Sequence, residues 1–189
     1  HYSVKEVAVP EGYAVTEESK EKGDIVLTNT HTPGTVDIPV TKIWVDNDNQ
    51  DGLRPTKITV KLLANGGEVA RKDITSETDW KETFTGLPKF KDGKEIVYTL
   101  QEEEVNNYSP SIDQESYTIT NTHTPGKTTL SVTKQWDDQE DKDGLRPKSV
   151  KVQLYADGKK SGEVIELSAE NRWTHTFADL DKNVKGKAV

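Results

Sequence analysis

The strongest constraint on this sequence is an internal repeat whose landmarks recur at a single spacing. The segment Asp-Gly-Leu-Arg-Pro occurs at 51–55 and again at 143–147. The segment Asn-Thr-His-Thr-Pro-Gly occurs at 29–34 and again at 121–126, so both pairs are 92 residues apart. A fixed period of this length indicates tandem copies of one small module. The chain should therefore contain repeated copies of one fold, each formed by fewer than 100 residues.

The register of the repeat predicts one complete copy and one copy divided between the two ends of the chain. Residues 2–6 match 98–102, and residues 180–189 match 87–96. The front part of the divided copy is therefore C-terminal and its back part is N-terminal. In order, we expect the C-terminal half of a repeat at 1–30, a linker at 31–35, a complete repeat at 36–121, a linker at 122–128 and the N-terminal half of a repeat at 129–189.

Composition narrows the class of protein. Hydrophobic residues make up 31% of the 189 residues, charged residues make up another 31%, and cysteine is absent. A small module of this kind has a marginal core, and disulfides cannot supplement it. The formal net charge of −8 argues against nucleic acid as a partner. No apolar run approaches membrane-spanning length, so we expect no membrane insertion of this segment.

Alternating apolar and polar residues predict strands rather than helices. The alternation is seen at 36–44, 57–62, 96–102 and 117–121, with turn-rich segments between them. Short strands at this spacing predict an all-β fold of tandem Ig-like or prealbumin-like β-sandwich repeats. The proline-containing linkers are expected to be semi-rigid, with His31 and His123 interpreted as spacers.

Polar residues occupy positions where the strand pattern places inward-facing apolar ones. A lysine or glutamate is rarely buried unless it is paired, so each needs a partner or a changed protonation state. One interpretation is a buried Lys–Glu ion pair beside a hydrogen-bonded asparagine, without covalent chemistry. The residues are Lys42, Glu102 and Asn121 in the complete copy, and Lys134, Glu6 and Asn29 in the divided copy.

The order of these motifs resembles the B-type repeat of Gram-positive collagen adhesins. The resemblance rests on Val-Thr-Lys-X-Trp, Asp-Gly-Leu-Arg-Pro, Tyr-X-X-X-Glu and Thr-Ile-Thr-Asn-Thr, which follow one another in the family's order. In that family, a spontaneous isopeptide bond joins the lysine of the first strand to the asparagine of the last, promoted by an acidic residue. The resemblance implies the triad Lys42, Glu102 and Asn121, and a second triad of Lys134, Glu6 and Asn29.

The isopeptide reaction explains why these residue types are needed together. Burial favours the neutral, nucleophilic form of an amine, and an asparagine amide offers a carbonyl as electrophile. A carboxyl group in the same pocket can shuttle protons to the departing ammonia. The reaction happens once within the protein, so the sequence predicts no enzyme beyond this single-turnover crosslinking.

Other chemical signals are weak. The acidic segment 46–52 resembles a Ca²⁺ loop, but the twelfth position counted from Asn47 is Ile58 rather than the required glutamate. A turn is the favoured interpretation, and we expect no metal and no cofactor. No nucleophile motif such as Gly-X-Ser-X-Gly is present. Trp44 lies two residues after Lys42 and on the same face of the strand, so it is a candidate to cover the lysine amine.

The resemblance implies a stalk repeat of a secreted, cell-wall-attached surface adhesin. A host extracellular-matrix ligand would then bind through another part of the parent protein. The alternative is that the repeats themselves bind a host matrix protein or a glycan. The divided copy further predicts that neighbouring copies join head to tail, because such a contact does not close and builds a fibre.

Overall fold

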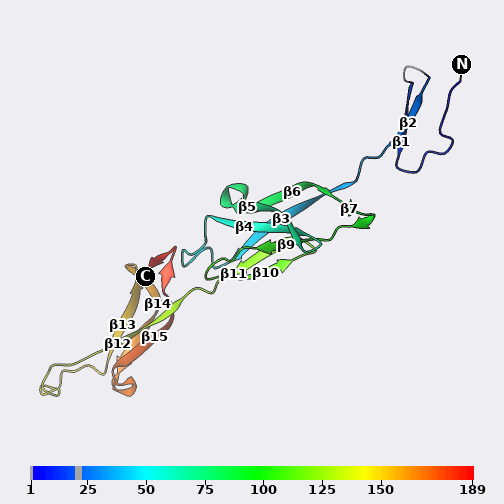
Figure 1. Cartoon of the computed structure of the whole chain (residues 1–189). Helices are drawn as coiled ribbons and strands as arrows, with labels where there is room; N and C mark the ends of the chain where they lie inside the picture. The colour runs from blue at the N-terminus through cyan, green and yellow to red at the C-terminus, as the bar shows by residue number, and fades with distance from the viewer. Residues whose placement is uncertain (1, 20–22) are drawn as a thin grey trace. The chain divides into compact units, whose positions relative to one another are not determined.

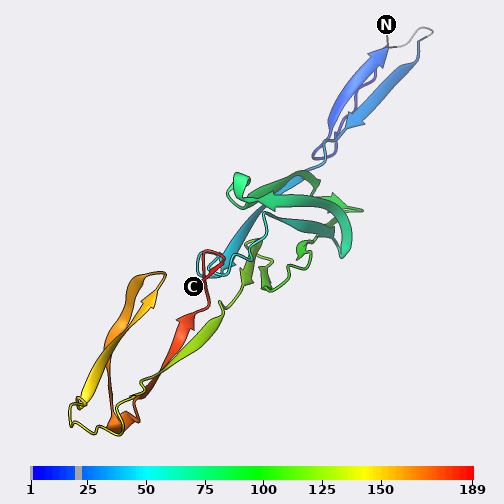
Figure 2. The same ribbon diagram turned by 90° about the vertical axis from the view of Figure 1, so that its left-hand side faces the viewer.

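The computed structural model describes residues 2–19 and 23–189, so residues 1 and 20–22 of the predicted half repeat 1–30 lie outside the described residues. Its N-terminal part contains an antiparallel hairpin of β1 (Ala14–Ser19) and β2 (Ile25–Thr30). The two strands lie side by side in both views (Figure 1, Figure 2).

The central part contains two main sheets, as expected for a sandwich. The four-stranded sheet has the order β10-β11-β3-β6, and the three-stranded sheet has the order β5-β4-β9. A short β7-β8 ladder and one 3₁₀ turn, η1 (Ser76–Thr78), complete this part. The strands are β3 (Thr35–Val45), β4 (Lys57–Ala64), β5 (Gly67–Thr75), β6 (Lys81–Pro88), β7 (Phe90–Lys91), β8 (Lys94–Glu95), β9 (Tyr98–Glu102), β10 (Ser109–Asp113) and β11 (Thr118–Thr122).

Both sheets contribute alternate side chains to one apolar core. In β3 the buried residues are separated by more exposed ones, which is the period of two that the sequence predicted. The prediction of an all-β sandwich is therefore confirmed. The buried apolar residues of the central part are Ile38, Val40, Ile58, Val60, Leu62, Ile74, Phe84, Tyr98, Leu100 and Ile119.

The first and last strands of the central part, β3 and β11, are neighbours and run parallel. The Thr41 N–H donates to the Tyr117 carbonyl at 3.2 Å, and the His123 N–H donates to the Val45 carbonyl at 2.8 Å. Residue numbers rise together along the two strands, which is the mark of a parallel pair. Residues distant in sequence are thereby brought to adjacent positions in one sheet.

Two predicted strand boundaries were wrong. Tyr117 was expected inside the last strand, but its φ of +51° places it in the turn before β11. A left-handed backbone cannot continue the extended ladder. Ile96 was expected to open the late strand, whereas β9 begins at Tyr98.

The C-terminal part repeats the front half of the central part. It contains the antiparallel pairs β12-β15, β13-β14 and β16-β17. The β12 and β15 strands lie side by side in both views (Figure 1, Figure 2). The elements are β12 (Lys127–Thr133), β13 (Ser149–Ala156), β14 (Lys159–Ser168), η2 (Ala169–Asn171), β15 (Thr174–Asp181), β16 (Asn183–Val184) and β17 (Lys187–Ala188).

Within the part of the chain that the structure describes, no helix combines the length and the apolar character needed to cross a membrane.

Candidate functional site

Lys42 and Asn121 are buried on the two neighbouring strands β3 and β11. The alternation that turns Ile38 and Val40 inward also turns Lys42 inward, and this lysine is only 4% exposed. Asn121 is 0% exposed. The parallel pairing of β3 with β11 is what places both residues in the same sheet. An amine and a carboxamide are thus both removed from water on adjacent strands.

Trp44 covers the lysine amine, as the sequence suggested. The Lys42 Nζ lies 4.4 Å from the centroid of the Trp44 ring. A cation at this distance is attracted by the ring face, and the indole also limits access of water. Trp44 therefore helps to define the environment of the Lys42 amine.

Glu102 lies at the end of β9, opposite Val60 of β4. Its side chain is half-buried and follows buried Leu100 at the strand period of two. The next residue, Glu103, instead meets Lys61 at 3.5 Å and the partly exposed Arg71 at 3.4 Å. Among adjacent glutamates, Glu102 is thus the one on the side of the strand that carries the core residues.

The divided copy shows its predicted residues in two parts of the chain. In the N-terminal part, the Asn29 Nδ2 donates to the Glu6 Oε1 at 3.0 Å, so two of these three residues are in direct contact. In the C-terminal part, the Lys134 Nζ lies 4.2 Å from the centroid of the Trp136 ring and donates to the Gln135 carbonyl at 2.8 Å. The placement of lysine over tryptophan is therefore repeated in both copies.

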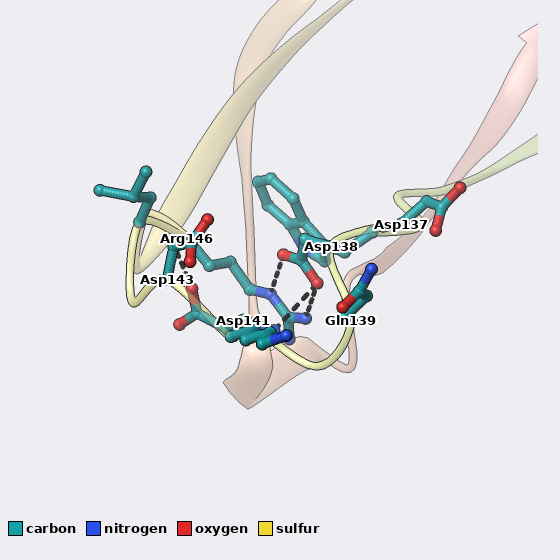
Figure 3. Close-up of a pocket in the computed structure, with 9 residues that line it drawn as sticks. Asp137, Asp138, Gln139, Asp141, Asp143 and Arg146 are labelled. Carbon is teal, nitrogen blue, oxygen red and sulfur yellow. Dashed lines mark hydrogen bonds and ion pairs between the residues drawn. The ribbon is translucent and has the colours of Figure 1, made fainter.

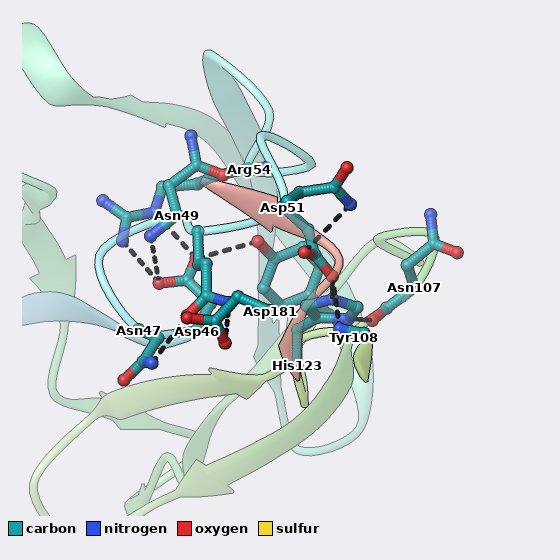
Figure 4. A network of polar contacts seen from close by, with 12 residues as sticks. Asp46, Asn47, Asn49, Asp51, Arg54, Asn107, Tyr108, His123 and Asp181 are labelled. Carbon is teal, nitrogen blue, oxygen red and sulfur yellow. Dashed lines mark hydrogen bonds and ion pairs between the residues drawn. The ribbon is translucent and has the colours of Figure 1, made fainter. Parts of the chain in front are cut away.

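The turn predicted at 46–52 is organised around the buried carboxylate of Asp46 (Figure 4). The Arg54 guanidinium donates to both carboxylate oxygens, at 3.0 and 2.6 Å. The Asn49 N–H and the Tyr108 hydroxyl add bonds of 3.0 and 2.8 Å. Burial disfavours the charged form of Asp46, but these hydrogen bonds outweigh burial and lower its pKa to about 2.

Tyr108 connects this loop to the lysine site. Burial, reinforced by the hydrogen bond to Asp46, raises the pKa of the Tyr108 hydroxyl well above its ordinary value. Its ring meets Trp44 edge-on at a centroid distance of 4.9 Å. Arg54 lies 5.6 Å from the same indole. The loop thus fixes the tryptophan that covers Lys42.

His123 is not a spacer, so that interpretation was wrong. Its Nδ1 lies 2.9 Å from the Asn107 carbonyl oxygen, and its Nε2 lies 2.9 Å from the Asp51 Oδ2. The hydrogen bond to Asp51 raises the pKa of His123 above its ordinary value. The same bond, followed by one from the Gly126 N–H, lowers the pKa of Asp51.

His31 was also wrongly interpreted as a spacer. Its Nδ1 lies 2.7 Å from the Gly12 carbonyl oxygen, and its ring packs on Tyr13 at a centroid distance of 5.3 Å. Recurrence of histidine at the same place in both copies was the sequence signal that could have revealed this role. Tyr108 and Arg54 were missed as well, although the repeated Asp-Gly-Leu-Arg-Pro segment marked the loop.

The 46–52 loop also meets the last residue of β15 and residues that follow this strand. The Gln50 Nε2 donates to the Asp181 Oδ1 at 3.0 Å, and the Asn183 Nδ2 donates to the Asp51 Oδ1 at 3.2 Å. The Gly186 N–H donates to the Gln50 carbonyl at 2.9 Å. The sequence did not indicate these contacts between the 46–52 loop and residues that come after the predicted linker 122–128.

These features define a class of protein: a tandem β-sandwich repeat with a lysine and an asparagine buried on its neighbouring first and last strands. The chain belongs to the family of Cna protein B-type domains, which matches residues 38–122 and 130–189. The resemblance to the B-type repeats of collagen adhesins is thereby confirmed. This family is a structural adhesin repeat rather than a catalytic enzyme.

The chain is similar to the following proteins of Staphylococcus aureus. The collagen adhesin of Staphylococcus aureus is 46% identical over 188 residues, which cover 100% of this chain but only 16% of that protein. The crystal structure of two B repeat units (B1B2) of the collagen binding protein Cna of S. aureus has a TM-score of 0.59 and 45% identity, covering 96% of this chain and 48% of that one. A single B repeat unit (B1) of that protein is 48% identical, with a TM-score of 0.47 and 82% of each chain covered.

Proposed function

We propose that this chain is a stalk segment of an extracellular, cell-wall-attached adhesin. The observation that carries the proposal is the combination of family membership with two copies of one module in tandem. We assign 36–121 as a complete repeat, 129–189 and 1–30 as the front and back halves of a repeat, and 31–35 and 122–128 as linkers. Repeats of this kind act by holding a distant binding domain away from the surface.

An isopeptide bond between Lys42 and Asn121 stabilises the complete repeat in this proposal. The neutral Lys42 Nζ attacks the Asn121 Cγ, forming a new C–N bond. Glu102 donates a proton to the amide and accepts one from the amine, and the side-chain nitrogen of Asn121 leaves as ammonia. The burial of both reacting residues and their positions on adjacent strands support this chemistry. Fixed proximity can contribute about 7–11 kcal/mol toward such a barrier.

The bond suits a protein under tension. It joins β3 to β11, which are the first and last strands of the repeat, so force applied at the two ends passes directly between them. The bond also closes a chain loop from Lys42 to Asn121. By analogy with a disulfide, loop closure of this size stabilises the folded state by about 4–5 kcal/mol.

The counterpart residues of the divided copy extend the proposal to a second isopeptide bond. The front half of this copy carries Lys134 over Trp136, and its back half carries Asn29 bonded to Glu6. Where a front half and a back half of this kind come together in one repeat, Lys134 can react with Asn29 and release ammonia. Peptides that join Lys134 to Asn29 are then expected on digestion, and Asn29→Ala is expected to remove them. Digests that lack these peptides oppose this second bond.

Intact mass and peptide mapping test the bond in the complete repeat. The parent should lose one ammonia, and digestion should release linked peptides that contain Lys42 and Asn121. Lys42→Ala and Glu102→Gln should retain the full calculated mass for this link, whereas the matched control Glu103→Gln should still lose ammonia. A parent chain without linked peptides would refute the bond.

Ligand binding is proposed to lie in another part of the parent protein. The relative is named a collagen adhesin, and this chain covers only 16% of it. We therefore expect the 189-residue chain to show no saturable binding to immobilised collagen or other matrix proteins. Saturable binding that an exposed-surface substitution abolishes would favour repeats that bind the host directly.

A further inference from the structure

The lysine side of the proposed isopeptide site is held by residues that are close to the lysine in the chain. In the C-terminal part, Arg146 donates to the two Asp138 oxygens at 2.9 and 2.6 Å (Figure 3). The Lys134 Nζ lies 4.2 Å from the centroid of the Trp136 ring, and the Arg146 guanidinium lies 5.7 Å from the same ring. The complete repeat has the same contacts around Lys42. The segment that follows the lysine thus orients it in both copies.

The glutamate of the proposed site lies in a different sheet from the lysine and the asparagine. Lys42 and Asn121 are on β3 and β11 of the four-stranded sheet, whereas Glu102 is on β9 of the three-stranded sheet. The Thr41 N–H donates to the Tyr117 carbonyl at 3.2 Å, so backbone pairing fixes the lysine strand beside the asparagine strand. The position of Glu102 against them depends on contacts that cross between the two sheets.

A turn at 113–118, which leads directly into β11, supplies such contacts. The Gln114 Oε1 accepts from the Leu100 N–H at 2.7 Å, and the Gln114 Nε2 donates to the Leu100 carbonyl at 2.9 Å. The Tyr117 hydroxyl donates to the Tyr98 carbonyl of the same strand at 3.5 Å. The turn therefore bonds to β9 at alternate residues, as a neighbouring strand would.

The shape of this turn is set by its own hydrogen bonds. The Asp113 Oδ1 accepts from the Glu115 N–H at 2.9 Å, and the Asp113 Oδ2 accepts from the Ser116 hydroxyl at 2.7 Å. Tyr117 then adopts a φ of +51°, which is unusual for a bulky residue and persists where the surrounding contacts determine it. Gln114 is thus presented to β9 by a turn of defined geometry.

We infer that Gln114 is a positioning residue for the proposed reaction between Lys42 and Asn121. It joins the strand of Glu102 to the turn that leads into the strand of Asn121, and it thereby holds the carboxyl group against the amide. This inference rests on the proposed isopeptide bond and adds a residue that acts through the position of Glu102. A carboxamide suits the role, because it offers one donor group and one acceptor side by side.

The rate of link formation tests this role. Pulse-labelling of the full chain during synthesis, followed by digestion at intervals, gives the fraction of peptide that joins Lys42 to Asn121. Gln114→Ala is expected to slow linking by about 10–100-fold, since a misplacement of about 1 Å can slow a reaction by this much. Gln114→Glu keeps the size of the side chain, but its ionised carboxylate cannot donate to the Leu100 carbonyl, so it should also slow linking. Glu115→Gln, with an exposed side chain in the same turn, is the matched control and should link at the parent's rate.

A second control separates position from stability. Ile74→Val shortens a fully buried side chain on β5, a strand that carries none of the three reacting residues, and it lowers the stability of the same core. Because nearly all molecules of this variant are still folded, it should link at the parent's rate. Hydrogen exchange of the Leu100 amide should be faster in Gln114→Ala than in the parent, and unchanged exchange contradicts the contact.

The outcomes distinguish the positioning role from the bond itself. If the parent links and Gln114→Ala links at the same rate, the positioning role is wrong and the bond stands. If Ile74→Val slows linking as much as Gln114→Ala does, lost stability controls the rate and the positioning role is again wrong. A parent chain that never links overturns the proposed bond and the role of Gln114 together.

Discussion

Acid titration of Asp46 is the most quantitative consequence of the loop geometry. Arg54, Tyr108 and the Asn49 N–H all bond to its buried carboxylate. Its pKa is lowered from 3.8 to about 2 in the folded protein. A carboxyl whose pKa is lowered by folding stabilises the native state above its unfolded pKa. The contribution of Asp46 to the free energy of unfolding is therefore complete above about pH 4 and disappears as pH falls through about 2.

The magnitude follows from the two pKa values. Their difference corresponds to roughly 2 kcal/mol of stability at neutral pH. Asp46→Asn removes the charge that holds Arg54 and Tyr108, so it should cost about 2–3 kcal/mol at pH 7. At pH 2 the parent carboxyl is about half protonated, so most of its charge-dependent stabilisation is lost and the difference between parent and variant should fall below about 1 kcal/mol.

Urea unfolding at pH 7 and pH 2 measures this difference. Replacing Trp136 and Trp173 with phenylalanine in both proteins leaves the central part as the source of tryptophan fluorescence. Asp48→Asn is the matched control, because Asp48 lies in the same loop with an exposed side chain. The control should change stability by no more than about 0.5 kcal/mol at either pH.

The comparison has a clear negative result. If Asp46→Asn costs the same free energy at pH 2 as at pH 7, then the loss does not come from the Asp46 charge. If Asp48→Asn shows the same pH dependence as Asp46→Asn, then the general acidity of the loop is responsible. Either outcome refutes the assignment of this stability to the Arg54–Asp46–Tyr108 contacts.

Two further predictions concern the residues around the linker. Asp51 raises the pKa of His123 above its ordinary value of 6.5. The protonated imidazole should therefore stabilise the folded state fully below pH 6.5, and this stabilisation should be lost as pH rises through the raised pKa. His123→Gln should flatten that part of a stability profile measured by urea unfolding, and an unchanged profile contradicts the role. A methyl group at Gly52, whose φ is +69°, would come within 2.5 Å of the Gly186 Cα. Gly52→Ala should therefore cost about 1–2 kcal/mol locally and speed exchange of the Gly186 amide by about 5–30-fold. Gly93→Ala, with a φ of +75° and open space, is the control for backbone strain alone, and equal effects argue against the close contact.

Much of the fold was predictable because alternation is a local property of the chain. The inward positions of Lys42 and Asn121 followed from their strand neighbours, and the structure buries both. Tyr117 was misplaced because a single left-handed residue does not alter the apolar pattern. The sequence could identify Glu102 rather than Glu103 as the inward-facing glutamate, because the second copy has a single glutamate, Glu6, at the position that matches Glu102.

The site's supporting contacts were not predictable in the same way. Gln114 shows why: its side-chain amide bonds to both the N–H and the carbonyl of Leu100, at 2.7 and 2.9 Å. It thereby substitutes for a neighbouring strand at this position. Nothing in the local sequence around Gln114 distinguishes it from an ordinary turn residue.

The sequence by itself determined the repeat, the strands and the polar residues that face inward, because each depends on spacing along the chain. Tertiary structure decided which strands are neighbours and which partner each buried carboxylate receives. Asp46 and Tyr108 are 62 residues apart, and their hydrogen bond exists only because the sandwich brings their loops together. The parallel pairing of β3 with β11 likewise places Lys42 and Asn121 in one sheet. Such long-range contacts depend on the packing of the whole domain, which no short segment encodes.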